Sequence, residues 1–198
     1  MDRHEWNERY ASKDLVWGVE PNRFVAQECS HVTPGRGVDV ACGEGRNAIW
    51  LARQGWRMTA VDFSEVAIDK GRRLAAAHAV TIEWIPADLA AWAPEPAHYD
   101  LVLVAYLQVP DPVRREIWRQ AAAAVAPGGS FLLVGHDSRN LHEGYGGPSD
   151  PAVLYTADDV VAAIGDDLTV ERAGEVLRPV ATGETAIDCL VRAVRAPG

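Results

Sequence analysis

The chain has 198 residues, a length that fits one domain of ordinary size but not two domains with a linker. Apolar residues make up 48% and charged residues 24%, with no apolar run near the ~20 residues of a membrane span, so the composition excludes disordered and membrane-spanning chains. The net charge of −9 and the scattered basic residues argue against nucleic acid as a partner, because binding to double strands needs clustered Lys and Arg.

The N-terminal segment has a helical pattern, and residues 1–10 are charged and lack the apolar core of a signal peptide. We therefore expect a cytoplasmic protein. The three cysteines, Cys29, Cys42 and Cys189, are widely spaced and include no Cys-x-x-Cys pair. This pattern predicts reduced thiols, with no disulfide framework and no zinc or other metal site.

From Gly37 onward, short β-branched runs alternate with amphipathic helices, which is typical of an α/β fold with a parallel sheet. Strands are predicted at residues 38–41, 57–61, 80–84, 101–105 and 131–134. One helix begins in the 43–47 loop and stops at Gly55, and a second is capped by Ser64. A third is predicted to begin at Asp111 and Pro112 and to stop at residues 127–129.

The last third of the chain predicts a loop, a helix and a hairpin. Residues 137–151 are rich in glycine and proline and are expected to form a lid. Thr156 and Asp159 form a capping box for a helix that ends near Gly165. The final runs, residues 168–176 and 186–194, have no helix between them, so they should pair antiparallel at one edge of the sheet.

The most informative segment is the turn around Gly43 and Gly45, between a predicted strand and a predicted helix. A Gly-x-Gly turn there lets a ligand approach the backbone at the carboxyl edge of the sheet. Asp62 follows 17 residues after Gly45, at the end of the second strand, where a carboxylate accepts hydrogen bonds from both hydroxyls of a ribose. The spacing predicts a ligand that contains adenosine.

The glycines alone leave a nicotinamide cofactor open, since Gly43, Gly45 and Ala48 also satisfy the Gly-x-Gly-x-x-Ala form of a dinucleotide fingerprint. Asp39 helps to distinguish the ligands. A carboxylate just before the loop would repel a pyrophosphate but would pair with an ammonium group. The pattern therefore favours a ligand with a cationic group.

Five segments follow one another along the chain, at residues 38–45, 61–64, 87–89, 99–106 and 127–129. In this order they resemble the first motif, the ribose acid, the adenine contact, the fourth motif and the turn before strand 5 of the class I S-adenosylmethionine-dependent methyltransferases. Within that family the chain is similar to the small single-domain type, like the tellurite-resistance and thiopurine methyltransferases. The resemblance implies a Rossmann-like, doubly wound sheet of seven strands in the order 3-2-1-4-5-7-6, with strand 7 antiparallel.

The resemblance also implies which residues hold S-adenosylmethionine. Asp39, Gly43 and Gly45 would bind the methionine part. Asp62 would bind the ribose, and Asp88 would bind the adenine amino group. The full expected set of cofactor-binding residues is Trp6, Arg9, Trp17, Asp39, Ala41, Gly43, Gly45, Asn47, Asp62, Phe63, Ser64, Ala87, Asp88, Leu89 and Ala105.

We expect one methyltransferase domain over residues 1–198. Residues 1–30 would form a helical segment that closes over the cofactor, where Arg9 would pair with the methionine carboxylate. The segment after strand 4 is Ala105-Tyr106-Leu107-Gln108 and not the Asn-Pro-Pro-Tyr type of tetrapeptide, so methylation of DNA bases is not expected.

Methyl transfer needs an acceptor lone pair aligned with the methyl group and no covalent protein nucleophile. A general base helps only when the acceptor carries a proton at neutral pH. His136 is the first candidate for a catalytic residue and Tyr106 the second, because they follow strands at the carboxyl edge. The expected acceptor pocket consists of Tyr10, Tyr106, Gln108, His136, His142 and Tyr145.

The sequence thus predicts an enzyme that transfers a methyl group from S-adenosylmethionine to an oxygen, nitrogen, sulfur or metalloid atom of a small molecule. An NAD(P)-dependent oxidoreductase and a non-enzymatic S-adenosylmethionine-binding regulatory domain remain alternatives. We expect a monomer or a homodimer, with neither nucleic acid nor a membrane as partner.

Overall fold

A seven-stranded sheet runs through the centre of the structure, a computed structural model that describes residues 2–198. The strands are β1 (Arg36–Val40), β2 (Arg57–Asp62), β3 (Ile82–Pro86), β4 (Tyr99–Ala105), β5 (Val125–His136), β6 (Thr169–Pro179) and β7 (Thr185–Val194). The helices are α1 (Arg3–Ala11), α2 (Arg23–Cys29), α3 (Arg46–Arg53), α4 (Glu65–Ala77), α5 (Val113–Ala123), α6 (Asn140–Glu143) and α7 (Ala157–Ile164), with a short 3-10 helix at Pro151–Val153.

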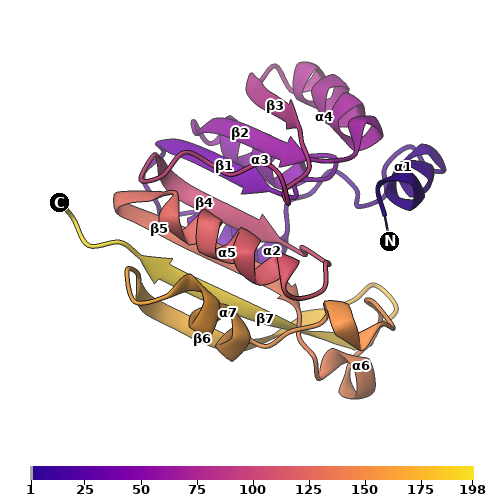
Figure 1. The fold of residues 1–198 in the computed structure, drawn as a ribbon. Helices are drawn as coiled ribbons and strands as arrows, with labels where there is room; N and C mark the ends of the chain where they lie inside the picture. The colour runs from indigo at the N-terminus through magenta and orange to yellow at the C-terminus, as the bar shows by residue number, and fades with distance from the viewer. Residues whose placement is uncertain (1) are drawn as a thin grey trace.

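The strand order is β3-β2-β1-β4-β5-β7-β6 (Figure 1). The strands β1 to β5 pair in parallel, and β7 runs antiparallel to both β5 and β6. This confirms the predicted topology, including the terminal hairpin. It also brings the ends of β1, β2, β4 and β5 to one carboxyl edge, where open α/β sheets bind ligands.

Helices cover both faces of the sheet, with α5 and α7 on one face and α2 and α3 on the other (Figure 1). Strand β4 shows the consequence in its sequence. Val102 and Val104 belong to the core on the α5 side, whereas Leu101 and Leu103 belong to the core on the α2 side. Burial on both faces explains why this strand is a continuous apolar run, as is usual in parallel sheets.

Side chains cap several helices as their sequences predict. The Ser64 hydroxyl accepts the Ala67 amide at the start of α4, and Thr156 and Asp159 form the predicted capping box of α7. At the other end of α7, Gly165 has a φ of +73° and ends the helix. These local signals fix the element boundaries that the sequence predicts best.

The helix after β4 ends earlier than predicted. α5 ends at Ala123, and residues 127–129, predicted to stop it, lie inside β5. Strand β5 begins at Val125, which pairs with Tyr99 before the register shifts. A Cβ on Gly129 would lie 2.9 Å from the Tyr99 carbonyl oxygen, so this glycine permits a bend in a strand and does not end a helix.

The start of α5 differs from the prediction as well. Pro112 occupies the N-cap position, and no side chain of residues 2–198 caps the helix. The Asp111 carboxylate forms ion pairs with Arg114 at 3.2 Å and Arg115 at 3.1 Å. Asp111 therefore holds two arginines of the helix and does not bind its first amides.

Part of the predicted lid has regular structure, because α6 lies within it. Asn140, only 2% exposed, donates a hydrogen bond to the Gly146 carbonyl oxygen and accepts one from the Ile187 amide of β7, each at 2.7 Å. The first half of the predicted lid is thereby fixed to the sheet.

Among residues 2–198, no helix is long and apolar enough to cross a membrane.

Candidate functional site

The turn between β1 and α3 is built from unusual backbone conformations. Ala41, Gly43 and Gly45 have φ values of +60°, +55° and +75°. Gly45 occupies the N-cap position of α3 in a left-handed conformation and offers no side chain to cap it. The backbone of residues 41–45, here called the glycine loop, therefore lies at the carboxyl edge of the sheet, as predicted.

Asp39 is fully buried one residue before the end of β1. Neither of its carboxylate oxygens has a hydrogen-bond partner among the described residues. Burial raises the pKa of Asp39 to about 7, and the nearby Ala48 amide opposes the rise without being aligned for a hydrogen bond. A buried carboxylate without a partner is costly, so this group suits a ligand that brings a cation to it.

Asp62 holds the glycine loop in place. Its carboxylate, at the end of β2, accepts the Gly43 amide at 2.8 Å and the Ser64 amide at 2.9 Å. Burial raises the pKa of Asp62, and the two amides partly oppose that rise. Each carboxylate oxygen can accept a second hydrogen bond, so Asp62 retains capacity for a ligand hydroxyl.

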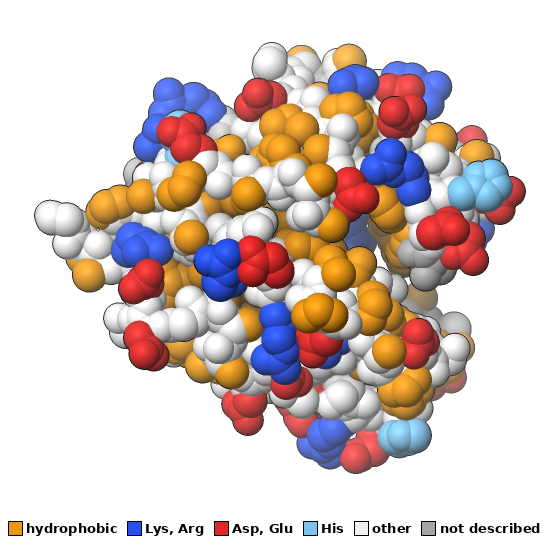
Figure 2. Space-filling model, in the orientation of Figure 1, with side chains coloured by type: hydrophobic (Ala, Val, Ile, Leu, Met, Phe, Trp, Pro, Cys, Tyr) orange, Lys and Arg blue, Asp and Glu red, His pale blue; other side chains and the backbone are white. Residues whose placement is uncertain are grey.

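A cavity of about 400 Å³, including its open mouth, lies beside Asp62. It is lined by five residues that the sequence predicted for the cofactor, namely Ala41, Asp62, Phe63, Asp88 and Leu89. Its other lining residues, Ala90, Leu107, Val109, Val113 and Ile117, were not predicted. Figure 2 shows a hollow on this face, bordered largely by hydrophobic side chains. An apolar cavity with two acids at its rim fits a flat ring joined to a sugar.

The N-terminal segment is tied to the glycine loop through Glu44. This carboxylate, 2% exposed, accepts the amides of Val16 at 2.9 Å and Trp17 at 3.4 Å. Lys70 of α4 lies 3.2 Å from Glu44 and donates to the carbonyl oxygens of Tyr10 and Lys13. Glu44 and Lys70 thus hold residues 10–17 over the loop, a role that the sequence did not predict.

Aromatic side chains complete this cover. Trp6 stacks on Tyr10 with ring centroids 5.5 Å apart, and the Trp17 indole donates to the Tyr10 hydroxyl at 3.3 Å. The Arg9 guanidinium lies over the Trp6 and Trp17 rings, 5.2 Å and 5.0 Å from their centroids. A Cβ on Gly43 would lie 2.7 Å from the Tyr10 hydroxyl, so the cover packs directly on this glycine. Tyr10 therefore lies with the predicted cofactor residues.

Four other predicted cofactor residues hold the surrounding structure. Asn47 accepts the Asn22 amide at 2.8 Å, and Ser64 both caps α4 and donates to Asn7 at 2.6 Å. The Ala87 amide donates to the Asp62 carbonyl oxygen at 2.9 Å, while Ala105 ends β4.

A second cluster of polar groups lies at the ends of β4 and β5 and on the terminal hairpin. Tyr106, which follows β4 with a φ of +57°, donates its hydroxyl to Asp188 at 2.7 Å and accepts Asn22 Nδ2 at 3.2 Å. Arg178 Nε donates to Asp188 at 2.6 Å, and His136 Nδ1 lies 3.2 Å from the same carboxylate. We call Tyr106, His136, Arg178 and Asp188 the acceptor-side cluster.

Asp188 is fully buried at the centre of this cluster. Burial opposes ionisation, but contacts with His136, Arg178 and Tyr106 outweigh it and lower the pKa of Asp188. Burial, with Asp188 nearby, raises the pKa of Tyr106. Its hydroxyl therefore stays protonated near neutral pH and serves as a hydrogen-bond donor.

The remaining acceptor-pocket predictions fall outside this cluster. His142 is exposed on α6, and Tyr145 is 45% exposed. Gln108 is half-buried, and its neighbours in sequence, Leu107 and Val109, line the 400 Å³ cavity. Conversely, the sequence did not predict Arg178 or Asp188. The available signal was Asp188 itself, an acid inside the otherwise apolar run of residues 186–191.

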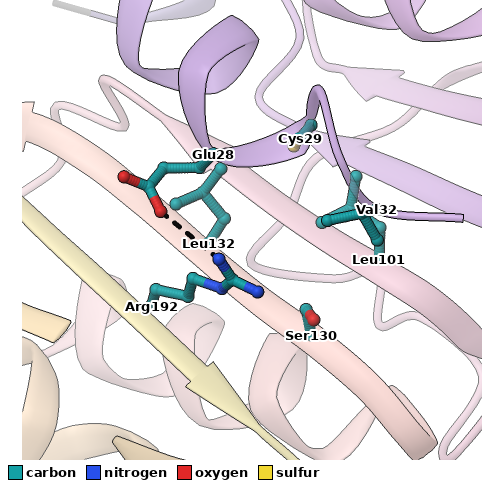
Figure 3. Close-up of a pocket in the computed structure, with 7 residues that line it drawn as sticks. All are labelled: Glu28, Cys29, Val32, Leu101, Ser130, Leu132 and Arg192. Carbon is teal, nitrogen blue, oxygen red and sulfur yellow. Dashed lines mark ion pairs between the residues drawn. The ribbon is translucent and has the colours of Figure 1, made fainter. Parts of the chain in front are cut away.

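A smaller cavity of about 190 Å³ lies at the opposite edge of the sheet, between α2 and strands β4, β5 and β7 (Figure 3). Glu28 and Arg192 form an ion pair across it at 3.5 Å. Burial raises the pKa of the adjacent Cys29 thiol to about 12, which leaves it a poor nucleophile. The lining of this smaller cavity thus consists mainly of an ion pair and apolar side chains, and it lies away from the glycine loop.

Comparison with known proteins agrees with this geometry. Residues 38–129 match the family model described as a methyltransferase domain. Over 106 residues the chain is 28% identical to the ribosomal RNA small subunit methyltransferase C of Alcanivorax borkumensis. That match covers 51% of this chain and 32% of the relative, so it spans about a third of the relative's length.

Two solved structures share the fold over nearly the whole chain. One comes from work on conversion of a disulfide bond into a thioacetal group during echinomycin biosynthesis, with 20% identity, a TM-score of 0.78, and coverage of 98% of this chain and 92% of that chain. The other is the N-methyltransferase NodS from Bradyrhizobium japonicum in complex with S-adenosyl-l-homocysteine, with 18% identity, a TM-score of 0.74, and coverage of 98% and 99%. At these identities the likeness is one of fold.

Proposed function

We propose that this protein transfers a methyl group from S-adenosylmethionine to a small molecule. Its fold is that of the class I methyltransferases, and residues 38–129 match a methyltransferase domain. The observation that carries the proposal is the fully buried carboxylate of Asp39 beside the glycine loop, which has no hydrogen-bond partner within residues 2–198. The methionine part of S-adenosylmethionine has an ammonium group that fits this carboxylate. A dinucleotide would bring a pyrophosphate, which Asp39 would repel.

The residues around the loop fit the rest of the cofactor. Asp62 would accept the ribose hydroxyls, and Asp88 would accept the adenine amino group. The apolar walls of the 400 Å³ cavity, including Phe63 and Leu89, would enclose the adenine ring. Residues 10–17, held by Glu44 and Lys70, would cover the methionine part and exclude water from it.

When bound, S-adenosylmethionine supplies a methyl group on a positively charged sulfur, which makes that methyl electrophilic. The protein then has to place an acceptor atom in line with the methyl group and keep water out. The acceptor-side cluster lies at the ends of β4 and β5, on the same sheet edge as the glycine loop. We therefore assign acceptor binding to this cluster, with His136 as the group that accepts a proton.

A small molecule suits this surface better than RNA. The chain carries a net charge of −9, which opposes the approach of a polyanion. The relative that acts on ribosomal RNA matches this chain over only 32% of its own length. That match therefore does not carry activity on RNA over to this chain.

Calorimetry with S-adenosylhomocysteine and with NADH tests the cofactor. We expect binding of S-adenosylhomocysteine and none of NADH, whereas tight binding of NADH alone would contradict the proposal. A screen of small phenols, thiols, amines and oxyanions, with ribosomal RNA as a parallel arm, tests the acceptor through release of S-adenosylhomocysteine. Release with RNA alone would overturn the small-molecule assignment.

A further inference from the structure

His136 and Asp188 are directly opposite each other in the sheet. They form a registered pair between β5 and β7, whose strands run antiparallel. Side chains of directly opposed residues lie on the same face of the sheet, with Cβ atoms about 4.5–5.5 Å apart. The contact between His136 and Asp188 is therefore set by strand pairing, which is more rigid than a loop.

The two nitrogens of His136 have different surroundings. Nδ1 is buried, lies 3.2 Å from Asp188 Oδ1 and has no aligned hydrogen-bond partner among the described residues. A small rotation of the ring would align an Nδ1–H with that oxygen. Nε2 has no hydrogen-bond partner within residues 2–198, and it is not buried. A ligand can therefore reach it. The carboxylate thus holds one nitrogen and leaves the other open to a ligand.

Arg178 and Tyr106 also contact the Asp188 carboxylate. Oδ2 accepts Arg178 Nε at 2.6 Å and the Tyr106 hydroxyl at 2.7 Å. Oδ1 faces His136 Nδ1 and, at 3.3 Å, Arg178 Nη2. The Tyr106 ring packs against His136 with centroids 4.9 Å apart, and Asn22 contacts the Tyr106 hydroxyl. Arg178 and Tyr106 therefore fix the carboxylate so that Oδ1 faces the imidazole.

We propose that Asp188 is a positioning residue that holds His136 as the Nδ1–H tautomer, so that Nε2 removes a proton from the acceptor. The acceptor is accordingly a protic group, such as a phenol, a thiol or an ammonium, and not an anion that needs no base. This proposal rests on the proposed methyl transfer. It adds a residue of β7 to the site and names the class of acceptor.

For an acceptor X–H, His136 Nε2 takes the proton, and the freed electron pair on X forms the new bond to the methyl carbon. The bond between that carbon and sulfur breaks, and its electron pair stays on sulfur, which becomes a neutral thioether. The imidazolium that results lies against Asp188 until its proton passes to solvent.

The first test measures the tautomer of His136 in the cofactor-free protein, from long-range proton–nitrogen-15 correlations assigned by their loss in His136→Gln. We expect Nδ1–H in the wild type. In Asp188→Asn, Arg178 and Tyr106 should donate hydrogen bonds to the amide oxygen of the new side chain. The amide NH₂ then faces His136 Nδ1. Nδ1 must then accept, so the ring proton moves to Nε2. An Nε2–H tautomer in the wild type, or no change in the variant, would overturn the proposal.

The second test uses the best protic acceptor from the screen. Asp188→Asn and His136→Gln should each lower kcat by about 10²-fold or more, the range for loss of general-base catalysis, with KM for S-adenosylmethionine changed by less than about twofold. The double variant should be no slower than either single variant, because the two residues act as one unit. Full activity of Asp188→Asn, or fully multiplicative losses in the double variant, would contradict the proposal.

A matched control exists at the opposite edge of the sheet, where His98 Nδ1 lies 3.2 Å from Glu95. Glu95→Gln breaks a histidine–acid pair of the same length and should leave kcat unchanged.

Because Asp188 is buried, S-adenosylhomocysteine affinity and thermal unfolding report whether its variant folds. If that variant does not fold, His136→Gln, at a partly exposed side chain, carries the activity test.

Iodide tests the acceptor class, since it accepts a methyl group without losing a proton. The wild type should methylate a protic acceptor much faster than iodide, and any rate with iodide should be equal in His136→Gln. Transfer to iodide alone would overturn the proposal. If the wild type does not bind S-adenosylhomocysteine, the proposed function fails, whereas binding with the unexpected tautomer defeats only the inference about Asp188.

Discussion

Asp62 accepts a hydrogen bond from the Gly43 amide at 2.8 Å, so the acid that would bind the ribose also holds the glycine loop. The two parts of the candidate cofactor site are therefore one structural unit. β2 supplies the acid and the turn after β1 supplies the amide, and parallel pairing of these strands sets their distance. A change at either residue should affect both binding and the shape of the loop.

Asp62→Ala should weaken S-adenosylhomocysteine by ~1–3 kcal/mol, because the variant leaves the Gly43 and Ser64 amides without their acceptor and removes the ribose contact. Isothermal calorimetry measures this change. Asp69→Ala, which removes an exposed carboxylate paired with Arg72 on α4, is the control and should bind normally. Equal affinity of the wild type and Asp62→Ala would remove Asp62 from the site.

Asp39→Asn should weaken S-adenosylhomocysteine but not 5′-methylthioadenosine, which lacks the amino-acid part. The reason is that Asp39 would meet the ammonium group, and a buried charged hydrogen bond contributes about 1.5–3 kcal/mol. Comparing the two ligands separates a local contact from a general loss of structure. A similar loss of affinity for both ligands would argue against an ammonium partner for Asp39.

Asp39 should also make the ligand-free protein less stable as the pH rises. Burial raises its pKa from 3.8 to about 7, so the folded state holds its proton more tightly than the unfolded state does. The stabilisation is complete below the unfolded pKa and is lost as the pH rises to the folded pKa, a difference of up to about 4 kcal/mol for a shift of this size. Denaturant unfolding at about pH 5 and about pH 8 should show a larger loss for the wild type than for Asp39→Asn.

Saturating S-adenosylhomocysteine is the control for this pH effect. Its ammonium group would favour the ionised carboxylate and should reduce the loss of stability at high pH. The same pH dependence in the wild type and in Asp39→Asn would show that other groups control it.

Glu44→Gln should loosen the N-terminal cover. The variant weakens the contacts with the amides of Val16 and Trp17 and breaks the ion pair with Lys70. A loss of about 1–3 kcal/mol from these contacts would raise the open population about 5-fold to 150-fold, measured as faster tryptic cleavage after Lys13. Glu8→Gln, at an exposed partner of His4 on α1, should cleave at the wild-type rate.

The sequence predicts most strands and helices and the position of the glycine loop because those features depend on local patterns, whereas the strand order followed from the family resemblance. Alternating β-branched runs, caps such as Ser64 and the Gly-x-Gly turn each act over a few residues. The prediction that residues 127–129 end a helix was wrong, because a Pro-Gly-Gly run can mark a bend in a strand as well as the end of a helix. A local pattern indicates that the chain turns there without showing which element turns.

The acceptor side depends on contacts between distant parts of the chain, which the sequence could not show. Glu44 meets Val16 across 28 residues, and Tyr106 meets Asp188 across 82 residues. Such partners are set by strand pairing and by the path of the N-terminal cover. His136 and Tyr106 were predicted from their places after strands. Asp188 stands out as an acid in an apolar run, but its contact with His136 is set only when β7 pairs with β5.

Gly45→Ala should destabilise the protein by more than its backbone conformation alone explains. Its φ is +75°, and a Cβ there would lie 2.3 Å from the Trp84 ring of β3, so the change adds a steric clash to about 1 kcal/mol of left-handed strain. Gly128 has the same φ of +75° with nothing within 4 Å of the added atom, which makes Gly128→Ala a control for strain alone. Denaturant unfolding should show a loss larger for Gly45→Ala by about 1–3 kcal/mol, the range for overpacking. Trp84→Leu in the Gly45→Ala background should recover part of that difference, whereas equal losses for the two glycines would show that Trp84 does not require a glycine at position 45.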